Sequence, residues 1–242
     1  MTDSPLWKPL QNSYDTSRKH LHQLAFFAVS PARMEAVGRM GLRPTPGGFG
    51  TPEFDGRVAR VEGSLLVHEQ SDGVATQRIS TVREAAVFFG REYEEVWFED
   101  FHDPLQPMDP DEDLSIDEVD SRLIGEWFAF GFDVLATLRS RATASDDASE
   151  PQIWPEHFDG ANEIGDADAG QRASYGFSPG DDAHPEPYAY VAAWGEIDRS
   201  DPYWNDSAFN GSSISYQDLL GPGDPEAACL SFFMDAYRRL HA

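Results

Sequence analysis

The chain has 242 residues, of which 40% are hydrophobic and 12% aromatic, and its formal net charge is −25. This apolar content is enough for a substantial core and excludes a disordered chain. The acidic balance excludes nucleic acid and anionic membrane surfaces as expected partners, because both carry the same sign of charge as the protein.

Two further features of the composition narrow the class of protein. The single cysteine, Cys229, excludes an intramolecular disulfide and a Cys-rich zinc or iron–sulfur site. Residues 1–19 carry no secretory signature, and the longest apolar run, Leu24–Val29, is far shorter than the ~20 residues that cross a bilayer. We therefore expect a soluble, cytoplasmic protein with no membrane span.

The first half of the chain is predicted to form a helix, a group of strands and a short helix. Residues 1–14 are expected to be a loose N-terminal arm. A helix should begin near Asp15 and run toward Gly38, with a break or kink at Pro31. The next segment, 42–56, is rich in Pro and Gly and predicts turns. After it should come two strands within 57–70, a third strand at 74–80 and a capped short helix at 81–90.

The second half begins with an acidic loop and then repeats this order. Residues 99–120 contain ten acidic residues and neither Lys nor Arg, which is typical of an exposed loop. The strongest helical pattern covers 115–141, and its apolar residues leave so little polar face that we expect a central helix. Strands are predicted at 187–194 and 212–219, and the last helix should follow Asp224 as its N-cap.

Together these elements predict an α+β fold with a largely antiparallel sheet of about six strands packed by several helices. We expect a single domain over residues 15–242. A duplication of two similar halves, 15–91 and 115–241, is an alternative. Both strand blocks open with a Gly-Phe turn and end with Ile-Ser ahead of a helix that contains Phe-Phe. Such a duplication would merge the strands into one sheet with a pocket near its axis.

Two segments hold the residues that could carry chemistry, PQIWPEHFDGANEIG at 151–165 and YGFSPGDDAHPEPYAYV at 175–191. Imidazoles and carboxylates bind zinc, manganese or iron, and they act as acids and bases. The sequence therefore predicts a divalent-metal or acid/base site formed by His157, Asp159, His184 and Glu186. In the structural alternative, His157 or Asp159 bonds to the backbone of a tight turn, and residues 181–187 are solvated surface.

Aromatic side chains gather in the same third of the chain, which is typical of a small-molecule pocket with a few polar groups. The predicted ligand-binding residues are Trp154, Glu156, His157, Asp159, Tyr175, Tyr188 and Tyr190. The alternative is that these aromatic residues pack as ordinary core.

One apparent catalytic motif is rejected. Residues 176–180 read G-F-S-P-G and match the nucleophile elbow of serine hydrolases. In that motif the residue after the serine donates its backbone N–H to the oxyanion hole, and a helix follows. Here that residue is Pro179, which has no N–H, and the segment after it is not helical in pattern.

The motifs TPGGFGTP, IWPEHFD and YGFSPGDDAHPEPYAYV, with the last helix, resemble a family of uncharacterised proteins from actinobacteria. The resemblance covers roughly residues 15–240. The order of elements is also similar to that of a second, remote uncharacterised family. In that pattern a small residue stands at the place of His157, whereas Asp159 has a counterpart. Neither resemblance implies a reaction.

Three classes of function remain open from the sequence. The first is a small-molecule-binding module with a pocket near 154–159 and 175–190. The second is a metal-dependent or acid/base enzyme that uses His157 and His184 with their neighbouring carboxylates. The third is a protein-interaction domain in which the same motifs are structural.

Overall fold

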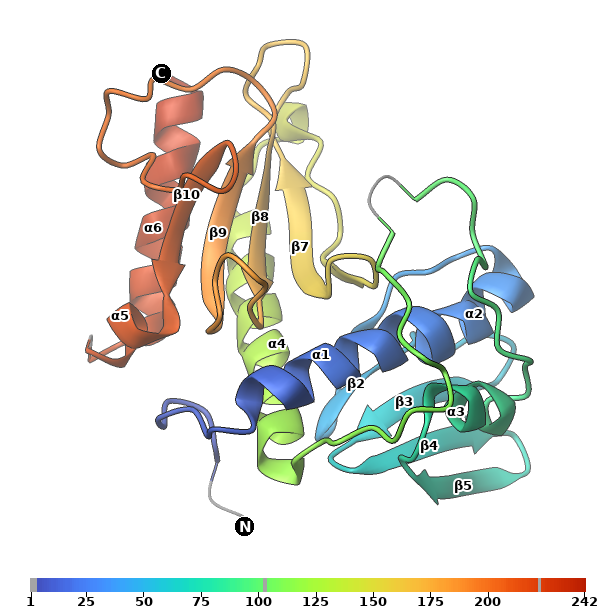
Figure 1. Cartoon of the computed structure of the whole chain (residues 1–242). Coiled ribbons are helices and arrows are strands. Elements are labelled where there is room, and N and C mark those ends of the chain that lie inside the picture. The colour runs from blue at the N-terminus through green and yellow to red at the C-terminus, as the bar shows by residue number, and fades with distance from the viewer. Residues whose placement is uncertain (1–3, 102–103, 222) are drawn as a thin grey trace. The chain divides into compact units, whose positions relative to one another are not determined.

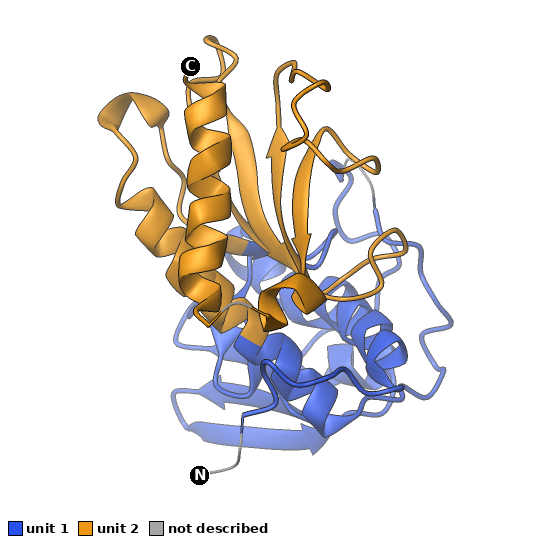
Figure 2. Cartoon of the chain, turned by 90° about the vertical axis from the view of Figure 1, so that its left-hand side faces the viewer, with its two compact units in different colours: residues 1–126, 153–158 blue, residues 127–152, 159–242 orange. Residues whose placement is uncertain are grey.

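The computed structural model describes residues 4–101, 104–221 and 223–242. The chain divides into two compact units, residues 1–126 with 153–158 (unit 1) and residues 127–152 with 159–242 (unit 2) (Figure 2). One boundary between the units falls inside helix α4 (Glu118–Arg139).

Unit 1 begins with a helical segment that stays unbroken through Pro31. It consists of α1 (Tyr14–Leu24), the π-helical turn η1 (Ala25–Val29) and α2 (Ser30–Val37). The expected break at Pro31 is therefore wrong, whereas a kink, the alternative to a break, stays a prediction. Because proline lacks the N–H that an α-helix would use there, the wider π turn just before α2 accommodates it. Gly38, with φ of +66°, ends the helix as predicted.

The first sheet is an antiparallel meander in the order β1-β2-β3-β4-β5 (Figure 1). Its strands are β1 (Arg43–Thr45), β2 (Gly48–Gly50), β3 (Val58–Glu62), β4 (Leu65–Gln70) and β5 (Gly73–Arg78). Helix α3 (Val82–Phe88) packs on β4, where His68 contacts the rings of Phe88 and Phe89. The predicted cap of α3 is confirmed, because the Thr81 hydroxyl accepts from Glu84 N at 3.1 Å.

Strands β1 and β2 lie in the segment that was predicted as turns. Their glycines permit close backbone contact. A Cβ on Gly48 would lie 2.2 Å from Val61 O, and a Cβ on Gly125 of α4 would lie 2.6 Å from the Gly48 backbone. Glycine is therefore used here for strand and helix packing and not only for turning the chain.

The second sheet is also an antiparallel meander, in the order β10-β9-β8-β7-β6. Its strands are β6 (Gln152–Trp154), β7 (Asp159–Ile164), β8 (Ala173–Ser178), β9 (Tyr188–Ala193) and β10 (Gly211–Ser215). The helices of unit 2 are the C-terminal part of α4, the 3-10 turn η2 (Ala144–Asp146), α5 (Tyr216–Leu220) and α6 (Pro225–Leu240). The predicted cap of α6 is confirmed, because Asp224 accepts from Ala227 N at 3.0 Å.

The core of unit 2 forms between one face of its sheet and helices α4 and α6. Phe177 of β8 contacts Trp127 and Phe130 of α4 and Phe233 of α6, with ring centroids 5.3–5.7 Å apart. Gly131 allows this contact, since a Cβ there would lie 2.6 Å from the Phe177 ring. The indole N–H of Trp127 donates to Ser178 O at 2.8 Å, which anchors α4 to the end of β8.

The predicted α+β class and antiparallel pairing are confirmed. The described residues form ten strands in two sheets, instead of about six strands in one sheet. The single domain over 15–242 and the duplication of 15–91 and 115–241 stay predictions. Residues 1–3 of the expected arm lie outside the described residues, and Ser4 Oγ donates to Glu126 at 2.5 Å. Among the described residues, no helix is long and apolar enough to cross a membrane.

Candidate functional site

The segment IWPEHF forms a strand and a tight turn in unit 1. Ile153 exchanges backbone hydrogen bonds of 2.9 and 2.8 Å with Leu42. Phe158 N then donates to Trp154 O at 2.8 Å, and Phe158 has φ of +53°. A positive φ is uncommon for an aromatic residue and marks a position that its surroundings hold in place.

His22 of α1 holds this turn. Its Nε2 lies 3.0 Å from Pro155 O and 3.1 Å from Glu156 O, so the ring donates to these carbonyl groups. The imidazole stacks on Phe158 with centroids 5.3 Å apart, and Phe158 contacts Phe49 edge-on. The turn that looked like a chemical motif is therefore built into the core of unit 1.

The predicted ligands of this segment do not share one environment. Trp154 and Glu156 are half-buried, whereas the His157 side chain is 53% exposed and lies 3.5 Å from Glu156 Oε1. The structural alternative for this turn is supported, but the bracing histidine is His22 and not His157.

The buried position of His22 predicts a pH dependence of stability. Burial lowers the pKa of His22 to about 4, although its bonds to Pro155 O and Glu156 O oppose the shift. Between pH 6.5 and 4 the unfolded chain binds a proton that the folded chain does not. The contribution of His22 to the free energy of unfolding is thus fully present above pH 6.5. It is lost as the pH falls toward 4, by at most about 1.4 kcal/mol per pH unit.

We expect His22→Gln, which keeps an N–H donor but does not titrate, to flatten the unfolding free energy between pH 6.5 and 4. Denaturant unfolding at a series of pH values measures this, with His157→Gln as the matched control from the same turn. A variant curve that runs parallel to that of the native protein would contradict the assignment.

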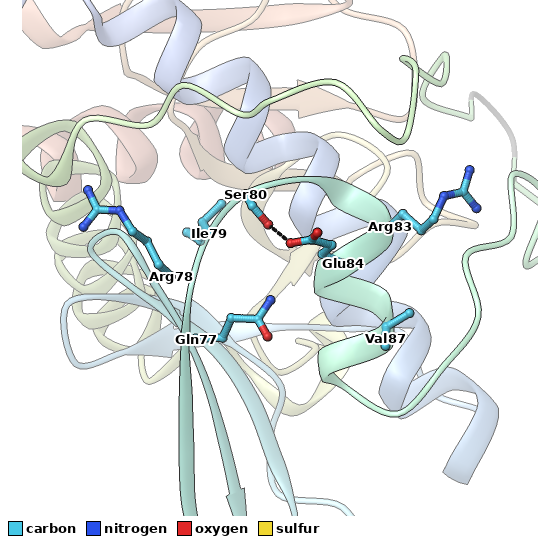
Figure 3. A pocket seen from close by; sticks show the side chains of 7 residues that line it. All are labelled: Gln77, Arg78, Ile79, Ser80, Arg83, Glu84 and Val87. Atoms are coloured by element: carbon cyan, nitrogen blue, oxygen red, sulfur yellow. Dashed lines mark hydrogen bonds between the residues drawn. The ribbon is translucent and has the colours of Figure 1, made fainter.

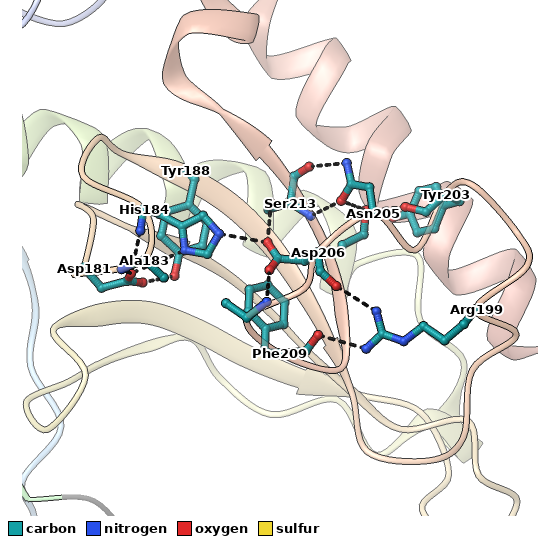
Figure 4. A network of polar contacts seen from close by, with 12 residues as sticks. Asp181, Ala183, His184, Tyr188, Arg199, Tyr203, Asn205, Asp206, Phe209 and Ser213 are labelled. Atoms are coloured by element: carbon teal, nitrogen blue, oxygen red, sulfur yellow. Dashed lines mark hydrogen bonds and ion pairs between the residues drawn. The ribbon is translucent and has the colours of Figure 1, made fainter.

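The second segment takes part in a hydrogen-bonded network of unit 2, drawn in Figure 4. Asp181 accepts from the Tyr188 hydroxyl at 2.6 Å, and His184 stacks on the Tyr188 ring. Nε2 of His184 lies 2.9 Å from Asp206 Oδ2, and its Nδ1 lies 3.3 Å from Asp181 Oδ1. Both ring nitrogens face carboxylates, so neither is open to a metal or a substrate.

This network holds two loops, 181–187 and 199–210, against the sheet. Ser213 of β10 donates to Asp206 Oδ2 at 2.5 Å, and Arg199 donates to the backbone oxygens of Asp206 and Phe209 at 2.7 and 3.0 Å (Figure 4). Burial opposes the charge on Asp181, but hydrogen bonds from Tyr188 and from backbone N–H groups keep its pKa below the usual value. The interpretation of 181–187 as solvated surface is therefore wrong at His184, whose side chain is 21% exposed, whereas the Asp181 side chain is 42% exposed.

Asp159 and Tyr190 form a second pair on the same face of this sheet. The Tyr190 hydroxyl donates to Asp159 Oδ2, and burial together with the Asp159 charge raises the pKa of Tyr190 well above its usual value. The ring of Tyr190 lies over Gly176, where a Cβ would meet it at 2.5 Å. Asp159, Tyr188 and Tyr190 thus lie together on one face of the sheet.

Tyr175 is not part of this group. It pairs with Val191 across the sheet, so its side chain lies on the face opposite to Tyr188 and Tyr190. There it packs edge-on against Phe233 of α6 and is completely buried. Because side chains alternate along a strand, Tyr175 does not share a face with the other two tyrosines of the motif.

The predicted metal set is not assembled. Within the described part of the chain, no three His, Cys, Asp or Glu side chains are grouped so that they could hold a metal ion. Glu186 is half-buried, and burial raises the pKa of its carboxyl group. Ser178 of the rejected elbow accepts from Gly180 N at 3.0 Å, so it caps the turn after β8.

Asp206 and Arg199, which complete the network, were not among the predicted residues. Asp206 is 6% exposed, yet it lies in a polar, Asp-rich stretch whose composition is typical of a surface loop. The one usable indication was the neighbouring aromatic cluster at 203–204, since buried aromatic residues mark a loop that is packed.

A groove in unit 1 is lined by none of the predicted residues. It has a volume of about 430 Å³ and lies between the end of β5 and helix α3 (Figure 3). Residues 77–80 form one side, and Arg83, Glu84 and Val87 form the other. The Ser80 hydroxyl donates to Glu84 across its end.

Fold and geometry define the chain as an α+β protein with two antiparallel five-stranded sheets, a pinned polar network in unit 2 and an open groove in unit 1. Comparison of the chain with protein-family models, with curated proteins and with solved structures gives no match.

Proposed function

We propose that the chain is a protein-interaction module that binds an extended segment of its partner as an added strand along β5. The observation that carries this proposal is the exposure of β5, where five of six residues are exposed. Every second residue of an edge strand turns its N–H and C=O groups outward, so such a strand can pair with another chain.

The other three edge strands of the described residues are shorter or more buried than β5. β1 and β6 have three residues each, and β1 contains Pro44. β10 begins with buried Gly211 and Ser212. β5 has six residues without Pro or Lys, and Arg78 at its C-terminal end is its one charged residue, so little protects this sheet edge.

The groove beside β5 provides a place for the side chains of an added strand. Ala75 lies opposite the buried His68 and is nevertheless exposed, because α3 does not cover this side of β5. Val87 of α3 is 63% exposed and Val74 of β5 is 66% exposed. Strand addition uses backbone hydrogen bonds for affinity and such alternate side-chain contacts for specificity.

The two other classes of function have less support from the geometry. A metal or acid/base enzyme needs an open imidazole or carboxylate group, and the His184 ring is engaged at both nitrogens. A small-molecule site that includes Tyr175 would need this side chain on the other face of its sheet.

A random-peptide library displayed on phage, selected against the immobilised full chain, tests the proposal. Peptides that bind should slow hydrogen exchange of the amides in Gly73–Arg78. The same peptides, N-methylated at alternate residues, should lose binding, because they can no longer donate to β5.

Two exposed valines provide a matched pair of variants. Val74→Lys, on β5, should weaken peptide binding at least about tenfold, which corresponds to about 1.4 kcal/mol. Val96→Lys changes a valine that is 72% exposed outside any strand and should have no effect. Exchange protection outside β5, or equal effects of both variants, would show that the proposal is wrong.

A further inference from the structure

We infer that the segment that binds β5 is basic, with apolar residues alternating between its Lys or Arg residues; this inference rests on the proposed function. The first reason is an acidic segment beside the groove. Leu114 N donates to Ser80 O at 2.7 Å and Arg83 N donates to Pro110 O at 3.0 Å, so residues 109–113 run along the start of α3. Four of these five residues are acidic.

The second reason is that Arg83, which lines the groove, is already neutralised. Its Nε and one terminal nitrogen form a bidentate pair with Asp111 at 2.7 and 3.0 Å. Asp109, Glu112 and Asp113 remain beside this pair, and Glu84 lines the groove itself. Carboxylates therefore outnumber uncommitted cations around the groove.

The third reason is the distribution of charge along β5, which has a carboxylate before its first residue and an Arg at its last. Asp72 is an exposed carboxylate in the turn that leads into β5. Arg78, at the other end, forms no ion pair with any of the described residues. A basic segment would therefore place its cations toward Asp72 and the carboxylates of 109–113, and a neutral residue opposite Arg78.

The exposed Val74 gives the apolar half of the pattern. Alternate residues of an added strand point to opposite faces, so the Lys or Arg residues would lie over the groove, toward Glu84 and the carboxylates of 109–113, and the apolar residues would lie beside Val74 on the other face. The net charge of −25 adds a long-range attraction for a basic partner and disfavours a second copy of this chain as the occupant.

Two capped heptapeptides test this inference with the full chain, acetyl-Thr-Lys-Val-Lys-Val-Lys-Thr-amide and its counterpart with Glu in place of Lys. At low salt the basic peptide should bind at least about tenfold more tightly, and it alone should protect the amides of β5. The difference should shrink at 0.5 M NaCl, where screening shortens the range of the charges to a few ångströms.

Neutralising variants separate local recognition from general attraction. Glu84→Gln with Glu112→Gln should weaken binding of the basic peptide about three- to tenfold. Glu196→Gln with Glu226→Gln, two exposed carboxylates of unit 2, should leave it unchanged. Equal effects of the two pairs would overturn the inference.

The peptides also distinguish the two proposals. Equal protection of β5 by both peptides would overturn the basic character of the partner but leave strand addition intact. The same holds if the phage selection enriches acidic or uncharged peptides that protect β5. If neither the heptapeptides nor any selected peptide protects β5, strand addition itself is wrong.

Discussion

Replacing Phe177 by Ala should lower the free energy of unfolding of unit 2 by about 3–5 kcal/mol, the cost of truncating a buried Phe at a site that cannot collapse. Phe177 is 1% exposed and contacts two rings of α4 and one of α6. Its loss would leave a cavity between the sheet and both helices, and a domain has only about 5–15 kcal/mol of stability to lose.

Hydrogen exchange of the amides in β8 and β9, combined with denaturant unfolding, measures this effect. Trp194→Ala is the control, since Trp194 is larger but 56% exposed and should cost less than about 1 kcal/mol. If Phe177→Ala cost no more than this control, the core of unit 2 would not be the one described.

Replacing Asn162 by Val should raise the stability of unit 2 by about 1–3 kcal/mol, which is the usual cost of a buried polar group without a partner. Asn162 lies on β7 and is 1% exposed, and neither its amide nitrogen nor its oxygen has a hydrogen-bond partner among the described residues. Val has a similar volume and favours strands. The structure offers no reason for an amide at this position.

Tyr175, the cross-strand neighbour of Asn162, provides a second test of the same idea. Its hydroxyl is buried and also without a partner in the described part of the chain. Tyr175→Phe should therefore be neutral or stabilising, whereas Tyr188→Phe, which removes the bond to Asp181, should destabilise by about 1 kcal/mol. A loss of stability in both Asn162→Val and Tyr175→Phe would show that these groups have partners in solution.

Capped helices and apolar strands could be predicted from the sequence. Thr81 and Asp224 cap the helices expected of them, and the segments 57–70 and 187–194 pair as strands. These signals are local, since a cap or an alternation of side chains depends on a few neighbouring residues.

The glycine-rich strands could not be predicted in the same way. Gly48 and Gly125 are far apart in the sequence, and only their contact explains why a run of glycines forms a strand there. The role of His22 in the candidate site could not be predicted for a related reason, because its contact joins residues that are far apart in the sequence. His22 braces the Pro155 turn from 133 positions away, and the sequence near the turn offered His157 instead.

The path of the chain between the two units has a consequence for how the protein is made. Unit 1 needs residues 153–158, which follow 26 residues of unit 2, and helix α4 contributes to both units. On the ribosome, the N-terminal half therefore cannot complete the bridge between Leu42 and Ile153, its turn at Pro155 or the contacts of His22 until part of the other unit has already emerged. We do not expect either unit to fold when it is expressed alone. A cut at one boundary would divide helix α4, and a cut at the other would remove a strand that the other unit requires.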